Sequence, residues 1–443
     1  MAKQRAFGPK ATQRSFFPVS GALQCVVRAV ATAGGHPIAV GGCVRDHLLG
    51  IAPKDVDIEV YGLPVPALKQ ALQPVATVNE VGKSFGILKV TTVGETFDVS
   101  LPRTESKTGA GHRGFAVTPD PALDFARACQ RRDFTINAMG LDLATGRLLD
   151  PCGGREDLAR GVLRHVSPAF AEDPLRVLRG AQFVARFDAR MHEDTVALCR
   201  SLQGELATLS AERIGGELNK LLAAPKPSKG LSALHDCGAL VLFPELAALQ
   251  NCPQDPKWHP EGDVWVHTLM VTDAAARLVR AHTLEPEESR LVMLGALCHD
   301  LGKPATTARE GDHIRSKGHD VAGAKPTRQF LKRLAITGRR ADAVVALVRE
   351  HLRPMQLYLE REHVSDGAIR RLARRVPIQR LCYVAEADFL GRTTPEAQNG
   401  RDPSCAWLRE QARRLDVDLR PPDPLLQGRH LLKLGHKPGP ELG

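Results

Sequence analysis

The stretch from Ile38 to Val60 constrains the fold of this chain more than any other. It opens as a short strand-like run, breaks at Gly41-Gly42, and continues over residues 44–49 with helical character. A glycine pair between a strand and a helix lets backbone N–H groups approach an anion, and the helix dipole favours negative charge there. A second predicted strand follows, and it carries Asp55 and Asp57.

Asp55 and Asp57 are spaced to act together. Residues i and i+2 of a strand point to the same face, so two carboxylates would lie side by side, with Val56 and Ile58 turned to the core. Such a pair suits Mg²⁺, which accepts one or two carboxylates together with phosphate oxygens and water. The alternative is a solvated Asp-Val-Asp at a strand edge. The upstream glycines and Arg45 favour the metal site.

Two motifs in this stretch carry a family resemblance. G-G-x-V-R-D followed by K-D-x-D-I-E-V resembles the head of the tRNA nucleotidyltransferases, the CCA-adding enzymes of the bacterial and eukaryotic class. Bacterial poly(A) polymerases are close relatives of that family. The resemblance extends from about residue 25 over nearly the whole chain. It implies that Asp55 and Asp57 are catalytic and hold Mg²⁺, and that Gly42 and Arg45 contact the nucleotide triphosphate.

Composition limits the remaining possibilities. With 43% hydrophobic and 25% charged residues the chain is globular, and 443 residues exceed a single core, so two to four domains are expected. We find no apolar run near the roughly 20 residues that span a membrane. The ten cysteines show no C-x-x-C or zinc spacing, which predicts reduced thiols in the cytoplasm. A net charge of +10 fits a polyanionic partner such as tRNA.

The head also contains a predicted hairpin and a long loop. Residues 85–92 and 96–101 read as strands joined across Gly94-Glu95. Residues 101–120 are polar, Gly-rich and basic, and a loop of this length is usually functional or disordered. In the resembled family the matching loop is mobile and helps the passage from C addition to A addition. Asp98 could be a third carboxylate of the metal site or a structural acid.

The run from Arg131 to Ala138, RRDFTINA, matches the second motif of that family, which contacts the sugar and phosphates of the nucleotide. Arg pairs bidentately with phosphate, so two adjacent arginines ahead of an apolar helix suit a triphosphate. The resemblance carries Arg132 and Asp133 over as nucleotide-binding residues. Asp133 could instead be the N-cap of the helix expected after it.

Asp173-Pro174 predicts a helix start, with Arg176 and Arg179 on the same face as Asp173. The alternative is a capped helix with two solvated arginines. E-D-x-x-R matches the base-reading motif of the family. Cytosine and adenine both present an exocyclic amine beside an unprotonated ring nitrogen, which a carboxylate and a guanidinium recognise. Asp173 and Arg176 could therefore select CTP and ATP over UTP and GTP, because a mismatch leaves buried groups unpaired. Arg179 would hold the nucleotide in position.

The C-terminal half contains the H…HD…D order of metal-dependent phosphohydrolases. Imidazoles together with carboxylates suit a first-row divalent ion, Ni²⁺, Mn²⁺ or Co²⁺, with Mg²⁺ as an alternative. In related bacterial enzymes this HD domain hydrolyses phosphomonoesters and 2′,3′-cyclic phosphates. The predicted ligands are His267, His299, Asp300 and Asp388, with His319 and His351 as further candidates.

We therefore expect an α+β chain with a small mixed-sheet nucleotidyltransferase head, an all-helical neck and body, and an all-helical HD domain. The end at Pro438-Gly439-Pro440 leaves truncation open. The expected parts are a flexible N-terminal extension (1–24), the head (25–154), the neck and body (155–250), a Pro-rich linker (251–262), the HD domain (263–395) and a C-terminal segment (396–443).

The predicted function is template-independent addition of C, C and A to the 3′ end of tRNA from CTP and ATP, with release of pyrophosphate. The predicted partners are tRNA, CTP and ATP, without a membrane, in a monomer or homodimer. The rivals are a poly(A) polymerase, an A-adding or CC-adding enzyme, and an RNA-binding HD nucleotide hydrolase with an inert head. The HD domain disfavours the first, the 101–120 loop disfavours a CC-only enzyme, and the Asp55/Asp57 pair disfavours an inert head.

Overall fold

The structure is a computed structural model that describes residues 19–81, 87–107, 115–420, 428–435 and 439. The chain divides into two compact units. Unit 1 comprises Met1–Glu217 and Lys229–Leu242, and unit 2 comprises Leu218–Ser228 and Phe243–Gly443. Most of the predicted N-terminal extension lies outside the described residues, although helix α1 (Gly21–Thr32), capped by Ser20, begins within it.

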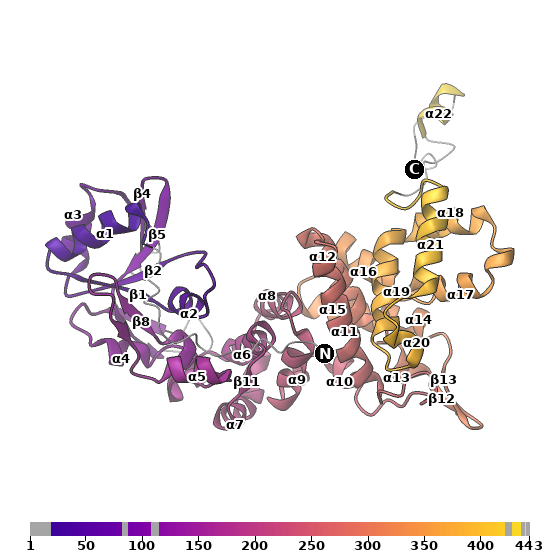
Figure 1. Ribbon diagram of the computed structural model, residues 1–443, viewed down its shortest axis with the longest axis horizontal. Coiled ribbons are helices and arrows are strands. Elements are labelled where there is room, and N and C mark those ends of the chain that lie inside the picture. The colour runs from indigo at the N-terminus through magenta and orange to yellow at the C-terminus, as the bar shows by residue number, and fades with distance from the viewer. Residues whose placement is uncertain (1–18, 82–86, 108–114, 421–427, 436–438, 440–443) are drawn as a thin grey trace. The chain divides into compact units, whose positions relative to one another are not determined.

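Unit 1 is built on a seven-stranded sheet of order β3-β4-β5-β2-β1-β8-β9 (Figure 1). Its neighbouring strands are antiparallel except for the parallel pair β2 and β5. Val93 and Gly94 turn the β4–β5 hairpin with φ of 48° and 79°, as a two-residue hairpin turn requires. The predicted hairpin is confirmed, but its turn lies one residue before the predicted Gly94-Glu95, because Glu95 already pairs with Thr92. The strands are β1 (His36–Val40), β2 (Asp57–Tyr61), β3 (Thr77–Val81), β4 (Ile87–Thr92), β5 (Glu95–Ser100), β8 (Gly140–Asp142) and β9 (Leu148–Leu149).

The core of the head includes strand β1, the neighbour of the central strand β2, and four of the five residues of β1 are buried. Ile38 and Val40 belong to a buried cluster with Tyr61 on β2 and Phe125 on α4 (Phe125–Cys129). Helix α1 packs against α3 (Val65–Leu72) and β1. Figure 1 shows α1 and α3 lying together beside the sheet. The strand and helix predicted around the glycine pair are confirmed as β1 and α2 (Gly42–Leu48).

The predicted loop over residues 101–120 contains regular structure at both ends. Strands β6 (Arg103–Lys107) and β7 (Phe115–Pro119) form an antiparallel pair. Residues 108–114 lie outside the described residues. The prediction of a continuous loop is therefore wrong for its two flanks, which form a two-stranded ribbon.

Helices dominate the rest of unit 1, and the division between the units falls within α8 and α9. The buried stripe predicted for the helix after Asp173 is confirmed in α6, where Val177, Ala181 and Val184 are all buried. Strands β10 (Val162–Leu163) and β11 (Arg190–Met191) form a short parallel pair. The helical elements are α5 (Gly154–Arg160), η2 (Pro168–Glu172), α6 (Leu175–Phe187), α7 (Glu193–Ser201), η3 (Gln203–Thr208), α8 (Ala211–Leu222), α9 (Pro227–Asp236) and η4 (Ala239–Leu242).

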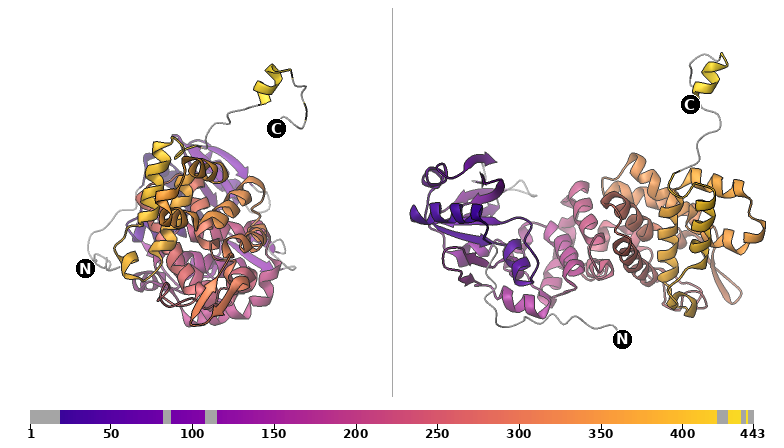
Figure 2. Two further views of the ribbon diagram at one scale, coloured as in Figure 1. Left: turned by 90° about the vertical axis from the view of Figure 1, so that its right-hand side faces the viewer. Right: turned by 45° about the horizontal axis from the view of Figure 1, so that its top comes forward.

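Unit 2 is mainly helical and is organised around α11, α12 and α19, which contact one another pairwise. In the views of Figure 2 most helices of unit 2, coloured from rose to orange, lie together as one bundle. The strands β12 (Thr307–Glu310) and β13 (His313–Ser316) form a hairpin. The HD domain, predicted to be all-helical, therefore also contains a short two-stranded sheet. The helices are α10 (Pro244–Ala247), α11 (Val264–Ala281), α12 (Pro286–Cys298), α13 (Lys303–Thr306), α14 (His319–Ala322), α15 (Ala324–Arg333), α16 (Gly338–Glu350), α17 (Arg353–Leu359), η5 (Arg361–His363), α18 (Asp366–Arg375), α19 (Ile378–Leu390), α20 (Pro395–Gln398), α21 (Pro403–Arg414) and α22 (Gly428–Lys433).

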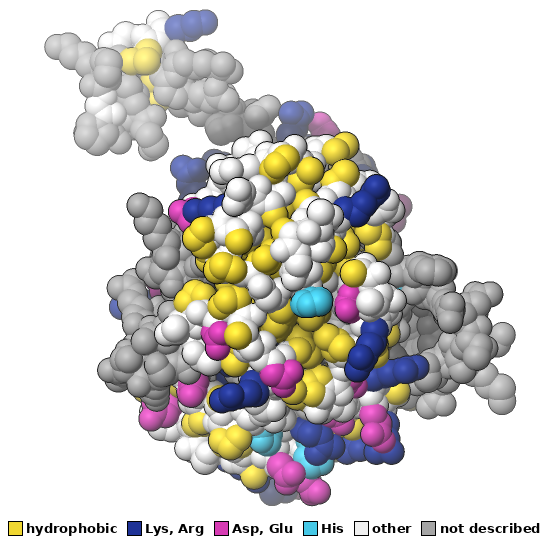
Figure 3. Space-filling view, turned by 90° about the vertical axis from the view of Figure 1, so that its left-hand side faces the viewer, with side chains coloured by type: hydrophobic (Ala, Val, Ile, Leu, Met, Phe, Trp, Pro, Cys, Tyr) yellow, Lys and Arg dark blue, Asp and Glu magenta, His cyan; other side chains and the backbone are white. Residues whose placement is uncertain are grey.

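The surface mixes charges of both signs. Basic and acidic side chains are interspersed on the face shown in Figure 3. The excess of ten positive charges in the sequence is thus not gathered into one patch on that face. Among the described residues, the structure contains no helix long and apolar enough to cross a membrane.

Candidate active sites

The acidic pair of unit 1 lies at the start of strand β2. Asp57 is the first residue of the strand and pairs in register with Asp98 on the parallel strand β5. Asp55 lies in a bend before the strand and is exposed, so the prediction that both acids stand on one strand is wrong. The pairing of β2 with its neighbouring strands begins only at Asp57. The side chain of Ile58 is buried in the core, as predicted. Asp98 also forms an ion pair of 3.0 Å with Lys89.

Like charges converge on Asp57. Burial raises the pKa of its carboxyl, Asp98, Asp55 and Glu59 raise it further, and Arg132 lowers it. A divalent cation would relieve this repulsion, so the oxygen donors fit Mg²⁺. Among the described residues, the groups of three or more metal-ligating side chains within 4.8 Å of one another all lie in unit 2. The acids of unit 1 are thus more open, in keeping with an ion that retains water and phosphate oxygens as ligands.

The two arginines of the second motif share one buried partner. Arg131 and Arg132 donate to Glu59 Oε1 over 2.9 and 2.8 Å, and Tyr61 donates to Glu59 Oε2 over 2.9 Å. Burial alone would lower the pKa of Arg132, but Glu59 outweighs it and the pKa is raised. Arg132 therefore remains charged, and it acts on Asp57, which lies on the same strand as Glu59.

Asp133 is held by side chains rather than capping a long helix. Only a single 3₁₀ turn, η1 (Thr135–Asn137), follows it, so the predicted apolar helix is wrong. Its Oδ1 accepts from the Phe134 N–H and from Asn137, and its Oδ2 accepts from Arg179 over 2.7 Å. Burial would raise the pKa of Asp133, but Arg179 and these hydrogen bonds lower it.

Arg45, predicted to contact the triphosphate, is buried and has protein partners. It donates to Asp46 over 2.7 Å and to Asn137, and its guanidinium lies 4.7 Å from the ring centre of Phe187. Asn137 therefore connects Arg45 with Asp133. Gly41, just before α2, has a φ of +77°, and a Cβ there would lie 3.0 Å from Arg132 Nη1. A larger residue would displace that guanidinium.

The predicted base-reading residues lie at the start of α6. Asp173 Oδ1 accepts from the Leu175 N–H, and the carboxylate accepts from Arg213 over 2.9 Å. The N-cap of α6 is Pro174, so the prediction of Asp173 as N-cap with Pro174 as the first helical residue is wrong by one position. Arg176 donates to the carbonyls of Ala169 and Arg131, over 2.7 Å each. Asp173 and Arg176 thus each have a positioning partner.

The second motif connects the two predicted clusters of unit 1. Arg131 contacts Glu59 on β2 through its side chain and Arg176 on α6 through its carbonyl. Asp133 pairs with Arg179 on the same helix. Glu59, two positions after Asp57, and Arg176 of the base-reading pair are therefore connected through Arg131.

The predicted metal centre of unit 2 is assembled from four buried imidazoles. His267 comes from α11 and His319 from α14, while His299 and His351 directly follow α12 and α16. Three of them engage main-chain carbonyls through Nδ1 at 2.7 to 2.8 Å, and His267 engages Glu261 at 2.8 Å. This arrangement places the proton on Nδ1 and leaves Nε2 as a metal donor.

The two carboxylates of the centre lie among these nitrogens. Asp300 approaches His299 Nε2 at 3.1 Å and His319 Nε2 at 3.3 Å, and Asp388 approaches His267 Nε2 at 3.0 Å. Burial would raise the pKa of both carboxyls, but their cationic and histidine neighbours lower both well below the usual value. Both acids are therefore charged and able to bind a cation.

Among the described residues, unit 2 contains three groups of candidate metal-ligating side chains, and the ligand atoms within each group lie within 4.8 Å of one another. His259, Glu261 and His267 make up a group that includes only one predicted ligand, and the remaining two groups consist of predicted ligands. His267, His299 and Asp388 form one, and Asp300, His319 and His351 form the other. His299 Nε2 and Asp300 Oδ2 are buried and lack a hydrogen bond of good geometry, although they lie 3.1 Å apart. Nitrogen and carboxylate donors of this kind fit a first-row divalent ion, so the residues present suit the metal that the sequence predicts.

Several residues of these sites escape sequence reasoning. Glu59, Asn137 and Arg213 in unit 1 engage the predicted nucleotide-binding residues. In unit 2, Lys303 contacts Asp300 over 2.7 Å and Arg392 contacts Asp388 over 3.0 Å. The sequence could have indicated Lys303 and Arg392, because they lie three and four residues after the predicted ligands Asp300 and Asp388, a spacing at which helical side chains meet. Arg213 is 40 residues from Asp173 and has no such signal.

Family models match three parts of the chain. The Poly A polymerase head domain matches residues 38–164, the probable RNA and SrmB-binding site of polymerase A matches residues 189–250, and the HD domain matches residues 264–392.

Curated relatives cover most of the sequence. The Multifunctional CCA protein of Stenotrophomonas maltophilia (strain K279a) is 40% identical over 398 residues, covering 85% of this chain and 93% of that protein. The Multifunctional CCA protein of Xylella fastidiosa (strain M12) is 40% identical over 369 residues, covering 81% and 85%.

Solved structures share the fold. The Bacillus stearothermophilus CCA-adding enzyme in complex with CTP aligns with a TM-score of 0.63 at 23% identity, over 96% of this chain and 90% of that one. The Thermotoga maritima CCA-adding enzyme complexed with tRNA aligns with a TM-score of 0.60 at 20% identity, over 95% and 88%.

A mixed-sheet head with an acidic strand start, joined to an HD domain, defines a nucleotidyltransferase with an attached phosphohydrolase-type domain. At 40% identity over more than four-fifths of its length, the chain belongs to the multifunctional CCA proteins, a family of tRNA nucleotidyltransferases. The predicted family and fold class are thereby confirmed.

Proposed function

We propose that this protein adds C, C and A to the 3′ end of tRNA from CTP and ATP and releases pyrophosphate. The observation that carries the proposal is the chain of contacts from Glu59, on the strand that begins at Asp57, through Arg131 to Arg176 on α6, which connects the strand of the acids with the base-reading helix. A single nucleotide needs both, because its α-phosphate must meet a metal while its base meets the reading pair. Relatives named CCA-adding enzymes, solved with CTP, ATP or tRNA, support the same assignment.

Asp55 and Asp57 hold Mg²⁺ in this proposal, with Asp98 as the neighbouring third acid. If Mg²⁺ is bound by these acids, it would supply the positive charge that lowers the pKa of the attacking 3′-hydroxyl and stabilises the leaving oxygens. Arg132, kept charged and oriented by Glu59, faces the triphosphate, and Gly42 lets backbone N–H groups approach it. The guanidinium of Arg45 must give up its hydrogen bond to Asn137 before it can contact a phosphate. In this proposal the main role of Arg45 is therefore to orient Asn137 in the second motif.

Asp173 and Arg176 choose the base. The carboxylate accepts from the exocyclic amine of cytosine or adenine, and the guanidinium donates to the adjacent ring nitrogen. Arg213 holds the Asp173 carboxylate, and the Ala169 carbonyl holds Arg176, so both groups are positioned before the nucleotide arrives. Arg179 steadies Asp133 behind them.

The test supplies tRNA ending at the discriminator base, at its first C, or at CC, with labelled CTP or ATP. We expect CTP to extend the first two substrates and ATP to extend only the third. Repeated A addition to every end would indicate a poly(A) polymerase. ATP addition to the CC end without any CTP incorporation would indicate an A-adding enzyme.

In unit 2 we assign a metal-dependent phosphohydrolase that acts on phosphomonoesters and 2′,3′-cyclic phosphates. His267, His299, Asp300 and Asp388 hold the ion, with His319 and His351 completing the second donor group. A divalent ion held by these side chains would supply the charge needed to activate water and polarise the phosphate.

Positive charge beside these ligands favours an anionic substrate. Lys303 and Arg392 bring that charge next to Asp300 and Asp388. The assay adds Ni²⁺, Mn²⁺, Co²⁺ or Mg²⁺ separately to chelator-treated protein with a 2′,3′-cyclic nucleotide. Absence of hydrolysis with all four ions would refute the assignment.

We also assign the protein to the cytoplasm. All ten cysteines are free thiols, the state maintained in a reducing compartment. This is the compartment in which bacterial tRNA is processed.

A further inference from the structure

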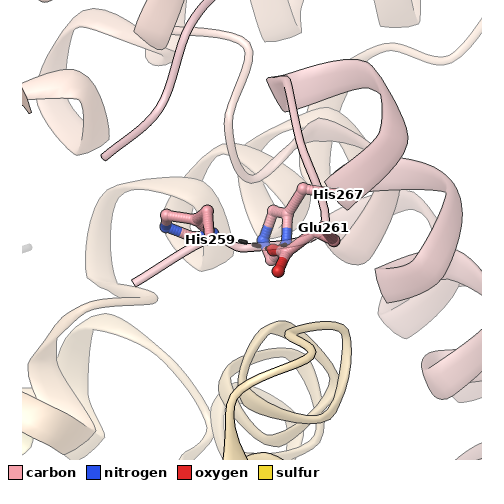
Figure 4. A group of neighbouring side chains, drawn as sticks. All are labelled: His259, Glu261 and His267. Atoms are coloured by element: carbon pink, nitrogen blue, oxygen red, sulfur yellow. Dashed lines mark hydrogen bonds and ion pairs between the residues drawn. The ribbon is translucent and has the colours of Figure 1, made fainter. Parts of the chain in front are cut away.

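The segment before α11 is more than a linker. Cys252 and Gln254 are buried, and the Glu261 side chain is 1% exposed. Figure 4 shows His259 and His267 on either side of Glu261, both directed at its carboxylate. A carboxylate buried this completely is costly unless its oxygens are well paired, so its partners indicate its role.

Glu261 uses both oxygens. Its Oε1 accepts from Nδ1 of His259 over 2.9 Å and from Nδ1 of His267 over 2.8 Å. Its Oε2 accepts from the Thr393 N–H over 3.1 Å. Thr393 follows Arg392, which pairs with Asp388, so Glu261 holds together two of the segments that supply the metal centre.

His267 differs from the other three imidazoles of the centre. His299, His319 and His351 engage neutral carbonyls through Nδ1, whereas His267 engages a carboxylate. A carboxylate on one ring nitrogen fixes the tautomer and makes the other nitrogen a more basic metal donor. His267 Nε2 lies 3.0 Å from Asp388 and 4.0 Å from Asp300, so its donor atom faces both acids of the centre.

We propose that Glu261 is the positioning residue of the metal centre: it holds His267 with Nε2 toward the ion and couples that histidine to the segment after Asp388. We assign it this role rather than that of a ligand to the ion because it contacts Nδ1 of His267, whereas the other ring nitrogen, Nε2, faces Asp388. The inference rests on the metal centre proposed above and deepens it.

The test uses the full chain stripped of metal and titrated with Co²⁺ alone, followed by the visible absorption of the bound ion. The variant is Glu261→Gln, which has one acceptor oxygen and so cannot serve the histidines and Thr393 together. The matched control is Glu245→Gln, at another buried carboxylate of unit 2, which pairs with Arg333. Nucleotide incorporation by unit 1 and the unfolding midpoint of the metal-free protein are recorded in parallel.

We expect Glu261→Gln to weaken Co²⁺ binding about 10- to 100-fold and to change the absorption spectrum. Incorporation should stay near the wild-type rate, and Glu245→Gln should bind Co²⁺ like wild type. Affinity within threefold of wild type in Glu261→Gln, or an equal loss in Glu245→Gln, overturns the inference while leaving the metal centre intact. A wild-type protein that takes up no Co²⁺ overturns the metal centre and the inference together.

A measurement on the unmutated protein covers the case in which Glu261→Gln does not fold. Nitrogen-15 NMR of the metal-free chain reports which ring nitrogen of His267 carries the proton. A proton on Nδ1 supports the role of Glu261, and a proton on Nε2 overturns it.

Discussion

Replacing Glu59 by Gln should loosen the nucleotide-binding face of unit 1. Glu59 is buried on β2, with 4% of its side chain exposed, and it accepts from Arg131, Arg132 and Tyr61. A glutamine fills the same volume but removes the negative charge that both guanidinium groups face. The two arginines would then repel each other without compensation.

The magnitude follows from the exposure of the partners. Breaking a fully buried ion pair by removing one member costs about 3–5 kcal/mol. The side chains of Arg131 and Arg132 are 20% and 16% exposed, so solvent screens part of this, and we expect about 2–3 kcal/mol. Tyr61→Phe removes only one neutral donor from Glu59 and should cost about 1 kcal/mol.

Amide hydrogen exchange across β2 reports the local free energy of opening in each variant, and steady-state incorporation reports the KM for CTP. If about half of the lost free energy must be spent on reordering Arg132 when CTP binds, binding weakens by about 1–1.5 kcal/mol. Because about 1.4 kcal/mol corresponds to a tenfold change in affinity, we expect KM to rise roughly tenfold. A change in opening free energy below about 0.5 kcal/mol, the range of ordinary surface substitutions, would refute the argument. So would a Tyr61→Phe effect as large as that of Glu59→Gln.

Further outcomes follow from the other sites. Asp55→Ala should abolish nucleotide addition yet leave tRNA affinity in a filter-binding assay nearly unchanged, and normal extension would contradict its catalytic role. Asp173→Ala should raise UTP and GTP incorporation relative to CTP and ATP by more than it weakens triphosphate binding, whereas unchanged discrimination would exclude base reading. His299→Ala should remove cyclic-phosphate hydrolysis but spare addition, and joint loss would show that the sites are not separable. Burial lowers the pKa of His259 and His351 to about 4 in the folded chain, against 6.5 ordinarily. As the pH falls, these histidines therefore bind protons in the unfolded chain before they do so in the folded chain. The free energy of unfolding of metal-free unit 2 should drop by about 2 kcal/mol per histidine between pH 6.5 and pH 5, which a lower urea midpoint would show.

Local patterns predict local structure well in this chain. The glycine pair gives the strand-to-helix turn before α2, and the two strand-like runs on either side of Gly94 give the β4–β5 hairpin, with its turn misplaced by one residue. The 3–4 spacing in α6 gives its buried stripe. Each of these depends on residues within about ten positions of one another, so periodicity and turn chemistry are sufficient.

The residue at which strand pairing begins, and the partners that charged side chains contact, depend on residues far apart in the sequence. The β2 ladder begins at Asp57 because its partner on β5 is Asp98, which nothing near Asp55 reveals. Arg132 meets Glu59 across 73 positions, and Asp173 meets Arg213 across 40. Ion-pair partners on different elements leave no periodic trace, so sequence reasoning assigned these side chains to the nucleotide alone.

A shared principle connects the two sites. In each unit a nearly fully buried glutamate lies behind the functional residues and engages two of them through one oxygen: Glu59 with Arg131 and Arg132, and Glu261 with His259 and His267. The second oxygen accepts from another group of the same unit, the Tyr61 hydroxyl or the Thr393 N–H. A carboxylate used in this way orders several donors at once and keeps their charge or tautomer suited to an anion or a metal. It also explains why each glutamate tolerates burial, since every oxygen is paired. Substituting either one should therefore disturb its own site through two side chains together, so that the effects of changing Glu59 and Arg132 are less than additive in a double-mutant cycle.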